Sequence, residues 1–368
     1  MKKTKLIVKT KSKIYPIIIG SNILKNTSSI LKSNNISFNK CLIIADKRVP
    51  KKNLLSLKKQ ILSKTKFTHL FNSSEKNKNQ QSVNIILNKL FKNNFNREDC
   101  IISLGGGITG DVAGYAASIY KRGLKFINIP STLLAQVDSS IGGKTGINNS
   151  YGKNLVGAFF QPDLVISDIN LLKSLSKREI ICGYGEIIKH SLIATKKTFN
   201  FLNKNKFKIL KLQSPYIEKA ISDSCKIKRN IVQLDEKEKN IRKVLNLGHT
   251  FAHAYEATLR YSGKLNHGEA VILGINSAVK FSLQNKLLNK NIHDQILSHI
   301  NHLKLPNNLN KYFNKKNISS IIKFMKSDKK NNSININLIL LKDIGKPVIN
   351  LNFKINKIQS FLKNELIN

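Results

Sequence analysis

The stretch "DCIISLGGGITGDVAG", residues 99–114, says most about the fold of this chain. An apolar run typical of a buried strand passes directly into three consecutive glycines and then into helical spacing. Gly105, Gly107 and Gly110 satisfy the pattern G-x-G-x-x-G, which lets a backbone approach a pyrophosphate at a helix N-terminus. Alone, the motif also fits a tight turn, because the acidic residue expected about twenty positions later is missing. Asp46, at the end of an earlier apolar run, could contact the ribose instead.

Apolar runs alternate with helical spacing on both sides of this motif. Strands are predicted at residues 5–10, 15–20, 40–46, 99–104 and 125–131, and a helix at 80–94. Strands that alternate with helices predict a parallel, doubly wound sheet, so we expect an α/β, Rossmann-like N-terminal domain over residues 1–170. From residue 171 the spacing is mostly helical, which predicts an α-helical C-terminal domain over residues 171–368. A late strand or hairpin is expected within residues 326–345.

The composition is that of a globular protein with an excess of lysine. The chain has 368 residues, 41% of them hydrophobic, and a formal net charge of +42. That charge suggests a nucleic-acid partner, but only 7 of the 63 basic residues are arginine, and the lysines are spread along the whole chain. We therefore expect no nucleic-acid partner, and each arginine is a stronger indication of function than any single lysine.

The sequence also indicates where the protein works. The four cysteines are scattered, with no C-x-x-C pair, which is typical of reduced thiols in the cytoplasm. Lysines interrupt the apolar residues near the N-terminus, so no signal peptide is expected. No apolar run is long enough to span a bilayer, and no membrane partner is expected.

Two polar segments are suited to an anionic ligand or a metal. "GGKTGINNSYGKN", residues 142–154, lacks P-loop spacing but carries lysines among glycines, which suits an anionic ligand and also fits a flexible loop. "GYGEIIKH", residues 183–190, places Glu186 and Lys189 on one helical face. A buried glutamate there needs a partner, whereas an exposed pair would be an ordinary helix salt bridge.

The segment "NLGHTFAHAYE", residues 246–256, would place two histidines and a glutamate on one face of a helix. Histidine and carboxylate are the ligands of catalytic zinc sites, which use three protein groups and keep one open position. Either the set lies on this one helix, or separate helices supply it. The first set is His249, His253 and Glu256, and the second is Glu186, His249 and His267.

Seven motifs occur in an order that resembles the 3-dehydroquinate synthase family, over about residues 40 to 345. They are "GGGITGDVAGYAAS", "RGLKFINIPSTLLAQVDSSIGGKTGIN", "GKNLVGAFFQP", "GYGEIIKH", "DEKEKNIRKVLNLGHTFAHAYEA", "HGEAV" and "DKK". The resemblance implies a lyase that converts 3-deoxy-arabino-heptulosonate 7-phosphate into 3-dehydroquinate and phosphate. This is a step of the shikimate pathway to chorismate and the aromatic amino acids. Catalytic NAD and a divalent metal, usually zinc and otherwise cobalt, are implied. The implied steps are transient oxidation, phosphate elimination, re-reduction and intramolecular aldol closure.

The resemblance also implies roles for individual residues. The implied metal ligands are Glu186, His249 and His267. The implied cofactor contacts are Asp46, Glu75, Lys78, Gly105, Gly106, Gly107, Asp111, Ser131, Thr132 and Lys153. The implied substrate contacts are Asp138, Lys144, Asn154, Lys189, Lys228, Arg242, Asn246, His253 and Lys330. Arg122 is expected to reach the phosphate bound by a neighbouring subunit, which implies a homodimer.

Three departures from the family pattern affect local geometry without removing a chemical group. Ser131 stands where the family usually has Thr, Gly185 where it has Ala, and Ala252 where it has Gly. Two enzymatic alternatives remain open, a cyclase acting on another sugar phosphate and a metal-dependent polyol dehydrogenase. Arg242 favours dehydroquinate synthase, because a substrate that bears a carboxylate needs a further cation.

Overall fold

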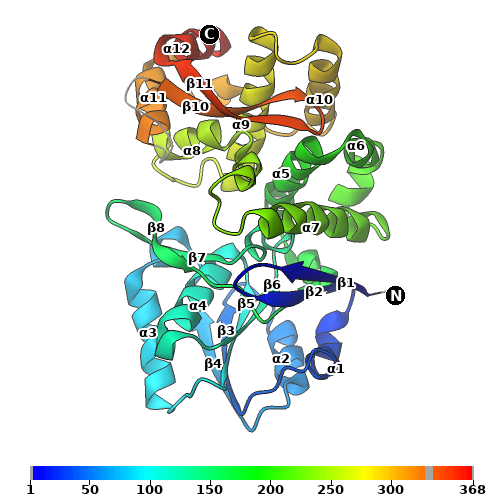
Figure 1. Ribbon diagram of the computed structural model, residues 1–368, viewed down its shortest axis with the longest axis vertical. Helices are drawn as coiled ribbons and strands as arrows, with labels where there is room; N and C mark the ends of the chain where they lie inside the picture. The colour runs from blue at the N-terminus through cyan, green and yellow to red at the C-terminus, as the bar shows by residue number, and fades with distance from the viewer. Residues whose placement is uncertain (1–2, 328–334, 367–368) are drawn as a thin grey trace. The chain divides into compact units, whose positions relative to one another are not determined.

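The computed structural model describes residues 3–327 and 335–366, and the chain forms two compact units (Figure 1). The first unit comprises residues 1–180 and 221–237, and the second comprises residues 181–220 and 238–368. The division thus differs from a single boundary at residue 170, because most of one helix, α7 (Tyr216–Leu234), belongs to the first unit. There the Cys225 thiol donates a hydrogen bond to the carbonyl oxygen of Gln136.

A seven-stranded sheet forms the centre of the first unit. Its strands, in spatial order, are β1 (Thr4–Lys9), β2 (Ile14–Gly20), β9 (Leu164–Asp168), β6 (Lys125–Pro130), β5 (Cys100–Gly105), β3 (Lys40–Asp46) and β4 (Thr65–Phe71). Only the pairing of β1 with β2 is antiparallel, and every other pairing in the sheet is parallel. The predicted α/β class with a mostly parallel sheet is therefore confirmed.

Helices cover both faces of this sheet, which is why its central strands are apolar along their whole length. Figure 1 shows α1 (Thr27–Lys32) and α2 (Lys51–Gln60) on one face, and α3 (Gln80–Lys92) and α4 (Gly107–Ile119) on the other. Because successive strand side chains point to opposite faces, Ile102 of β5 packs on the α1–α2 side and Ile101 packs on the α3–α4 side.

The order of the strands predicts where a ligand binds to the sheet. Counting β3 as the first strand, β4, β3, β5, β6 and β9 follow the spatial order 2-1-3-4-5 of flavodoxin-like sheets. In such sheets, ligands bind outside the carboxyl ends of the strands where the order reverses, which here lies between β3 and β5. Asp46 ends β3 and Gly105 ends β5, so both residues lie at this point.

An antiparallel hairpin of β7 (Lys144–Asn149) and β8 (Gly152–Phe159) completes the first unit. Its strand β7 packs against α4. The two strands approach closely at a pair of glycines, since a Cβ on Gly157 would lie 2.1 Å from the carbonyl oxygen of Thr145. The segment predicted as a polar loop, residues 142–154, therefore includes β7 and the start of a regular hairpin.

Helices make up most of the second unit. They are α5 (Lys177–Ala194), α6 (Lys196–Leu210), α8 (His249–Thr258), α9 (His267–Gln284), α10 (Lys290–His302), α11 (Ile318–Ser327) and α12 (Ile355–Glu365). The predicted late strand is confirmed as β10 (Asn335–Asp343), which forms a hairpin with β11 (Lys346–Lys354), a strand beyond the predicted range. Short 3₁₀ turns occupy Ile23–Asn26, Glu75–Asn77, Tyr120–Arg122, Ile169–Ser174, Ile241–Asn246, Leu309–Lys311 and Lys315–Asn317, and a π turn occupies Ala135–Ser139.

Helix α9 is the centre of the second unit, because it is buried on all sides and α8, α10 and β10 pack against it. Aromatic rings join its neighbours to it: Phe251 of α8 and Phe361 of α12 both contact Phe281 of α9, with centroids 6.4 and 5.1 Å away. No helix within the described ranges is both long and apolar enough to cross a membrane.

Candidate active site

The glycine turn between β5 and α4 is the first candidate part of the site. A Cβ on Gly105 would lie 2.5 Å from Thr109 Oγ1, and one on Gly107 would lie 2.9 Å from Ser139 Oγ. Gly106 is the N-cap of the 13-residue helix α4, and a Cβ there would lie 3.1 Å from Thr132 Cγ2. A ligand can approach this backbone because side chains are absent, and the exposed N–H groups of a helix start favour an anion. The turn therefore fits a pyrophosphate.

Five of the predicted residues of the first unit form a connected polar cluster beside this turn. Lys78, which is buried, binds the Asp111 carboxylate of α4 and the side-chain oxygen of Asn154 of β8. Lys153 of β8 lies 3.3 Å from the carboxylate of Glu75. Burial raises the pKa of Asp111, and the charge of Lys78 partly offsets this effect. The cluster therefore offers both carboxylates and cations at the carboxyl end of β5.

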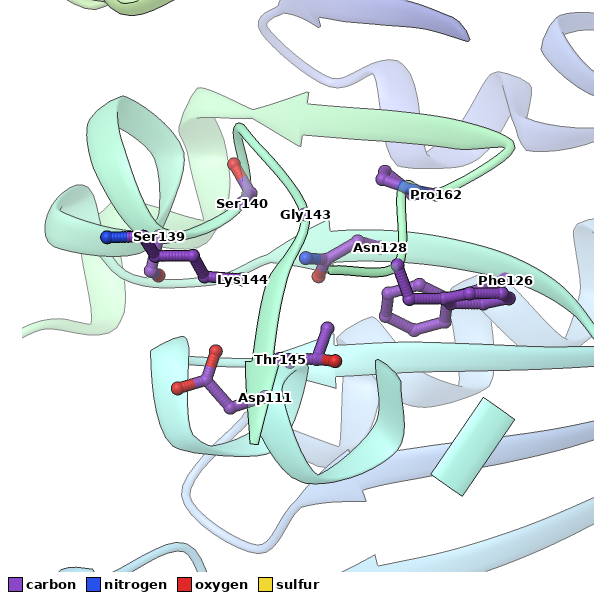
Figure 2. Close-up of a pocket in the computed structure, with 11 residues that line it drawn as sticks. Asp111, Phe126, Asn128, Ser139, Ser140, Gly143, Lys144, Thr145 and Pro162 are labelled. Carbon is purple, nitrogen blue, oxygen red and sulfur yellow. The ribbon is translucent and has the colours of Figure 1, made fainter. Parts of the chain in front are cut away.

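A small pocket lined by both polar and apolar side chains lies against this cluster (Figure 2). Its lining includes Asp111 and Gly110 of α4, Asn128 of β6, Ser139, and Lys144 of β7. Figure 2 shows Asp111 and Lys144 among these side chains, so two residues predicted for different ligands line the same pocket.

Asp46 occupies the predicted place at the end of β3, but it has a partner that the sequence analysis did not identify. Arg48 donates to both oxygens of the Asp46 carboxylate, at 3.2 Å from Nε and 2.9 Å from the terminal nitrogen. Asp46 is buried, whereas the Arg48 side chain is 62% exposed. The scarcity of arginine in this chain is the signal that could have drawn attention to Arg48, but the sequence analysis did not use it there.

Asp138 and Lys228, each predicted as a substrate contact, come together within the first unit. Lys228 of α7 binds the Asp138 carboxylate at 2.8 Å and the Asp138 carbonyl oxygen at 2.7 Å. Lys228 is 6% exposed, so its charge is held in a fixed place by these two oxygens. Ser131 and Thr132, also predicted, follow β6, where Ser131 N donates to the carbonyl oxygen of Gly105 at 2.8 Å.

The three predicted metal ligands come together in the second unit from three helices. Glu186 lies within α5, His249 begins α8 and His267 begins α9. Nε2 of His249 lies 3.5 Å from Glu186 Oε1, and Nε2 of His267 lies 3.8 Å from the same oxygen. Tetrahedral zinc with ligand bonds of about 2.0–2.1 Å separates its ligand atoms by about 3.3 Å. The donor types and their spacing therefore fit a zinc ion.

Neighbouring groups hold each of these side chains in an orientation suited to ligation. Lys189 pairs with Oε2 of Glu186, which leaves Oε1 toward the histidines. His249 Nδ1 lies 3.2 Å from the carbonyl oxygen of Leu247, and His267 Nδ1 lies 2.9 Å from Oε2 of Glu256. Both imidazoles thus engage Nδ1 elsewhere and keep Nε2 for a metal.

The two histidines differ in their electrostatic surroundings. Burial, together with the nearby charge of Lys189, lowers the pKa of His249 and so favours its neutral form. Burial also acts to lower the pKa of His267, but the carboxylates of Glu256 and Glu186 outweigh it, and the pKa is raised.

Two close helix contacts made by glycines position the metal cluster. A Cβ on Gly268 would lie 2.1 Å from the carbonyl oxygen of Cys182, and one on Gly185 would lie 2.8 Å from the carbonyl oxygen of Gly268. These contacts bring the Glu186 turn of α5 against the His267 turn of α9. The departure at Gly185 thus has a structural reason, because the backbone of Gly268 leaves little room for the alanine that the family usually has.

The one-helix alternative for the metal site receives no support from the geometry. Among the described residues, Glu186, His249 and His267 bring donor atoms within 4.8 Å of one another, and so do His253, Glu256 and His267. The set of His249, His253 and Glu256 does not meet this distance. His253 is exposed, and its ring centroid lies 5.4 Å from that of His249.

The remaining predicted residues are placed as follows. Arg242 is 2% exposed, and the Asn246 amide donates to Glu238 at 2.6 Å. Arg122 is exposed and its backbone is left-handed, with φ of 66°. Lys330 lies outside the described residues.

The fold and the two donor sets define a dinucleotide- and metal-dependent enzyme. Profiles of the 3-dehydroquinate synthase N-terminal and C-terminal domains match residues 68–182 and 183–331. The chain is 60% identical to the 3-dehydroquinate synthase of Pelagibacter ubique (strain HTCC1062) over 98% of both chains, and 37% identical to that of Bartonella tribocorum over 98% of this chain and 97% of the relative. The chain belongs to the 3-dehydroquinate synthase family.

Solved structures agree in fold. A 2-deoxy-scyllo-inosose synthase complexed with carbaglucose-6-phosphate, NAD⁺ and Co²⁺ superposes with a TM-score of 0.86 at 24% identity, covering 98% of this chain and 100% of the other. A 2-epi-5-epi-valiolone synthase from Streptomyces hygroscopicus subsp. jinggangensis 5008, with NAD⁺ and Zn²⁺ bound, gives a TM-score of 0.84 at 22% identity, with 98% and 99% coverage. The fold is thus shared with cyclases that act on other substrates.

Proposed function

We propose that this protein converts 3-deoxy-arabino-heptulosonate 7-phosphate into 3-dehydroquinate and phosphate, a step of the shikimate pathway toward chorismate and the aromatic amino acids. The observation that carries the proposal is 60% identity to a 3-dehydroquinate synthase over nearly the full length of both chains. The cluster of Glu186, His249 and His267 supports it, because a lyase of this kind needs a metal with an open position.

The proposal assigns NAD to the first unit, whose part of the chain corresponds largely to residues 1–170. The glycine turn Gly105–Gly107 would hold the pyrophosphate, and Asp46 at the strand-order reversal would contact a ribose. The other proposed contacts are Glu75, Lys78, Asp111, Ser131, Thr132 and Lys153. When bound, NAD supplies reversible hydride transfer, and the metal supplies a Lewis acid that makes a bound hydroxyl more acidic.

The proposed metal site belongs to the C-terminal part of the chain, residues 171–368. Glu186 and the two histidines would supply one negative charge and two neutral ligands, a set found in catalytic zinc sites. Lys189 neutralises the second oxygen of Glu186 and thereby favours ligation through the first. Co²⁺ is the second metal that this donor set would accept.

Fixed cations explain how the substrate would be oriented. The substrate carries a carboxylate and a phosphate, and buried guanidinium and ammonium groups bind such anions without reorganisation. Arg242 and Lys228 are both buried, and Lys228 is already immobilised by Asp138. The proposed substrate contacts are Asp138, Lys144, Asn154, Lys189, Lys228, Arg242, Asn246, His253 and, outside the described residues, Lys330.

His253 is the proposed group for proton transfer. Its ring neighbours those of His249 and His267, at centroid distances of 5.4 and 6.1 Å, and it is exposed. As an imidazole that is not a metal ligand, His253 would be able to exchange protons with a substrate hydroxyl near neutral pH, which a ligand histidine could not do once it is coordinated.

We further propose a homodimer that works in the cytoplasm. Arg122 is exposed on a short turn in which Lys121 and Arg122 both have a left-handed backbone. Arg122 would reach the phosphate in the neighbouring subunit. The four cysteines are all free, as expected in a reducing compartment.

The test is a direct assay of the purified, zinc-loaded protein with NAD. Incubation with 3-deoxy-arabino-heptulosonate 7-phosphate should release phosphate and form 3-dehydroquinate in equal amounts, while glucose 6-phosphate should release none. Release of phosphate from glucose 6-phosphate alone would assign the chain to a cyclase of another substrate and overturn the proposal.

A further inference from the structure

Glu256 lies beside the proposed metal cluster without belonging to its three ligands. It is 6% exposed on α8, and its Oε2 lies 2.9 Å from Nδ1 of His267 on α9. The two helices are held close together at their glycines, where a Cβ on Gly274 would lie 2.2 Å from the carbonyl oxygen of Gly248. This close packing brings a buried carboxylate against the outer nitrogen of a proposed ligand.

The hydrogen bond determines which nitrogen of His267 faces the cluster. A carboxylate only accepts hydrogen bonds, so the proton of the neutral imidazole lies on Nδ1, and Nε2 keeps its lone pair. That lone-pair nitrogen lies 3.8 Å from Glu186 Oε1, on the side where the ligand atoms converge. A carboxylate acceptor also increases the basicity of the imidazole toward a metal.

His249 provides an internal comparison. Its Nδ1 contacts the carbonyl oxygen of Leu247 at 3.2 Å, so a neutral backbone group fixes its tautomer. The two proposed imidazole ligands are therefore oriented in the same sense by different acceptors, one charged and one neutral. Only the charged acceptor is a side chain, and a substitution can remove it without changing the ligands.

We propose that Glu256 is a positioning residue, which fixes the tautomer and ring orientation of His267 and so strengthens metal binding. This inference rests on the proposed ligand set. It assigns Glu256 no contact with substrate and no bond to the metal. The competing role is that of a ligand, because Glu256, His253 and His267 also bring donor atoms within 4.8 Å of one another.

The experiment measures zinc affinity by chelator competition and zinc stoichiometry by elemental analysis, with no substrate present. Glu256→Gln, which keeps a neutral acceptor, should weaken zinc binding by about tenfold, and Glu256→Ala should weaken it by about a hundredfold. The wild type should bind one zinc per chain. The Co²⁺-loaded Glu256 variants should show an altered visible spectrum, since the orientation of the His267 imidazole changes.

Glu269→Gln is the matched control. Glu269 is a buried glutamate in the first turn of the same helix as His267, but its carboxylate accepts from Asn266 N at 2.9 Å in a capping box, which Gln preserves. It should bind zinc as the wild type does. Thermal unfolding of the metal-free proteins checks that each variant folds. The number of zinc ions bound per wild-type chain tests the ligand role of Glu256 even if Glu256→Ala does not fold.

The outcomes separate failure of this inference from failure of the ligand set. Equal zinc affinity in Glu256→Gln, Glu256→Ala and Glu269→Gln would overturn the positioning role. Two zinc ions in the wild type, falling to one in Glu256→Gln, would overturn it in favour of the ligand role. Undiminished zinc binding by His267→Ala would instead overturn the proposed ligand set itself.

Discussion

Nε2 of His249 lies 3.5 Å from Oε1 of Glu186, although the two residues belong to different helices of the second unit. His253 lies one helical turn after His249 and is exposed, whereas His249 is buried. The two histidines of "NLGHTFAH" therefore have different surroundings, and different roles are proposed for them.

Substitution of each histidine tests this division. His249→Ala should lose zinc on dialysis, because one of three ligands is gone. His253→Ala should retain one zinc per chain while its turnover falls by roughly 10²- to 10⁴-fold, the usual contribution of a general acid or base. Zinc analysis alongside steady-state kinetics measures both effects. Loss of zinc from His253→Ala would instead support the one-helix ligand set of His249, His253 and Glu256.

Gly185→Ala tests the close contact between α5 and α9. The new Cβ would lie 2.8 Å from the carbonyl oxygen of Gly268, a backbone atom that cannot move without shifting the start of α9 and His267 with it. We expect a loss of about 1–3 kcal/mol in the free energy of unfolding and weaker zinc binding. Chemical denaturation and chelator competition measure the two quantities. A fully stable variant with normal zinc affinity would show that the helices adjust freely.

Gly106→Ala tests the glycine turn of the first unit. The added methyl group would lie 3.1 Å from Thr132 Cγ2 and would cover part of the backbone that a pyrophosphate must approach. NAD affinity, measured by calorimetry, should fall by about tenfold or more, which is about 1.4 kcal/mol. Zinc affinity should stay unchanged, because the metal ligands belong to the other unit. Normal NAD binding would mean that the dinucleotide does not use this turn.

The stability of the protein should decline in acid because of His299. This residue is 1% exposed on α10, between the Tyr184 hydroxyl and the Asn203 side-chain oxygen, both 3.0 Å away. Burial lowers the pKa of His299 from 6.5 to about 3. Between pH 6.5 and about 3 the unfolded chain binds a proton at this histidine that the native state does not bind. The contribution of the neutral, buried His299 to the free energy of unfolding is therefore complete above pH 6.5 and is lost as the pH falls toward 3. The slope is up to about 1.4 kcal/mol per pH unit.

His299→Gln should flatten this dependence, as measured by urea unfolding between pH 4 and 7 (about the range in which an ordinary histidine titrates). His302→Gln is the comparison and should change the slope far less, because His302 lies on the same helix but is exposed, and its charge is the smallest of the causes that lower the pKa of His299. An unchanged slope in His299→Gln would assign the acid sensitivity to other groups.

The sequence predicted the parts of the structure that depend on local pattern. The apolar run ending in Gly105 predicted a strand, a turn and a helix, because burial on both faces and a close backbone approach each leave a local signature. The grouping of Glu186 with His249 and His267 followed from the family resemblance. Residue spacing alone left it as one of two arrangements.

Contacts between distant segments were not predictable in this way. Most of α7 belongs to the first unit because Cys225 and Lys228 contact Gln136 and Asp138, and no periodicity in α7 encodes that choice. The sequence offered Glu256 only as a ligand of the one-helix set, and its contact with His267 of another helix was not predictable from spacing. Gly185 was recognised only as a departure from the family pattern, and the sequence did not show that the carbonyl oxygen of Gly268 would lie 2.8 Å from a Cβ at this position.

The most direct test of the central claim compares phosphate release with NADH formation. The zinc-loaded protein is incubated with heptulosonate phosphate, and NAD is supplied in a far smaller amount than the substrate. A synthase regenerates its cofactor in every cycle, so phosphate should exceed the supplied NAD many times over, with no net accumulation of NADH. Accumulation of NADH in step with substrate consumption, without phosphate release, would contradict the account and identify a polyol dehydrogenase.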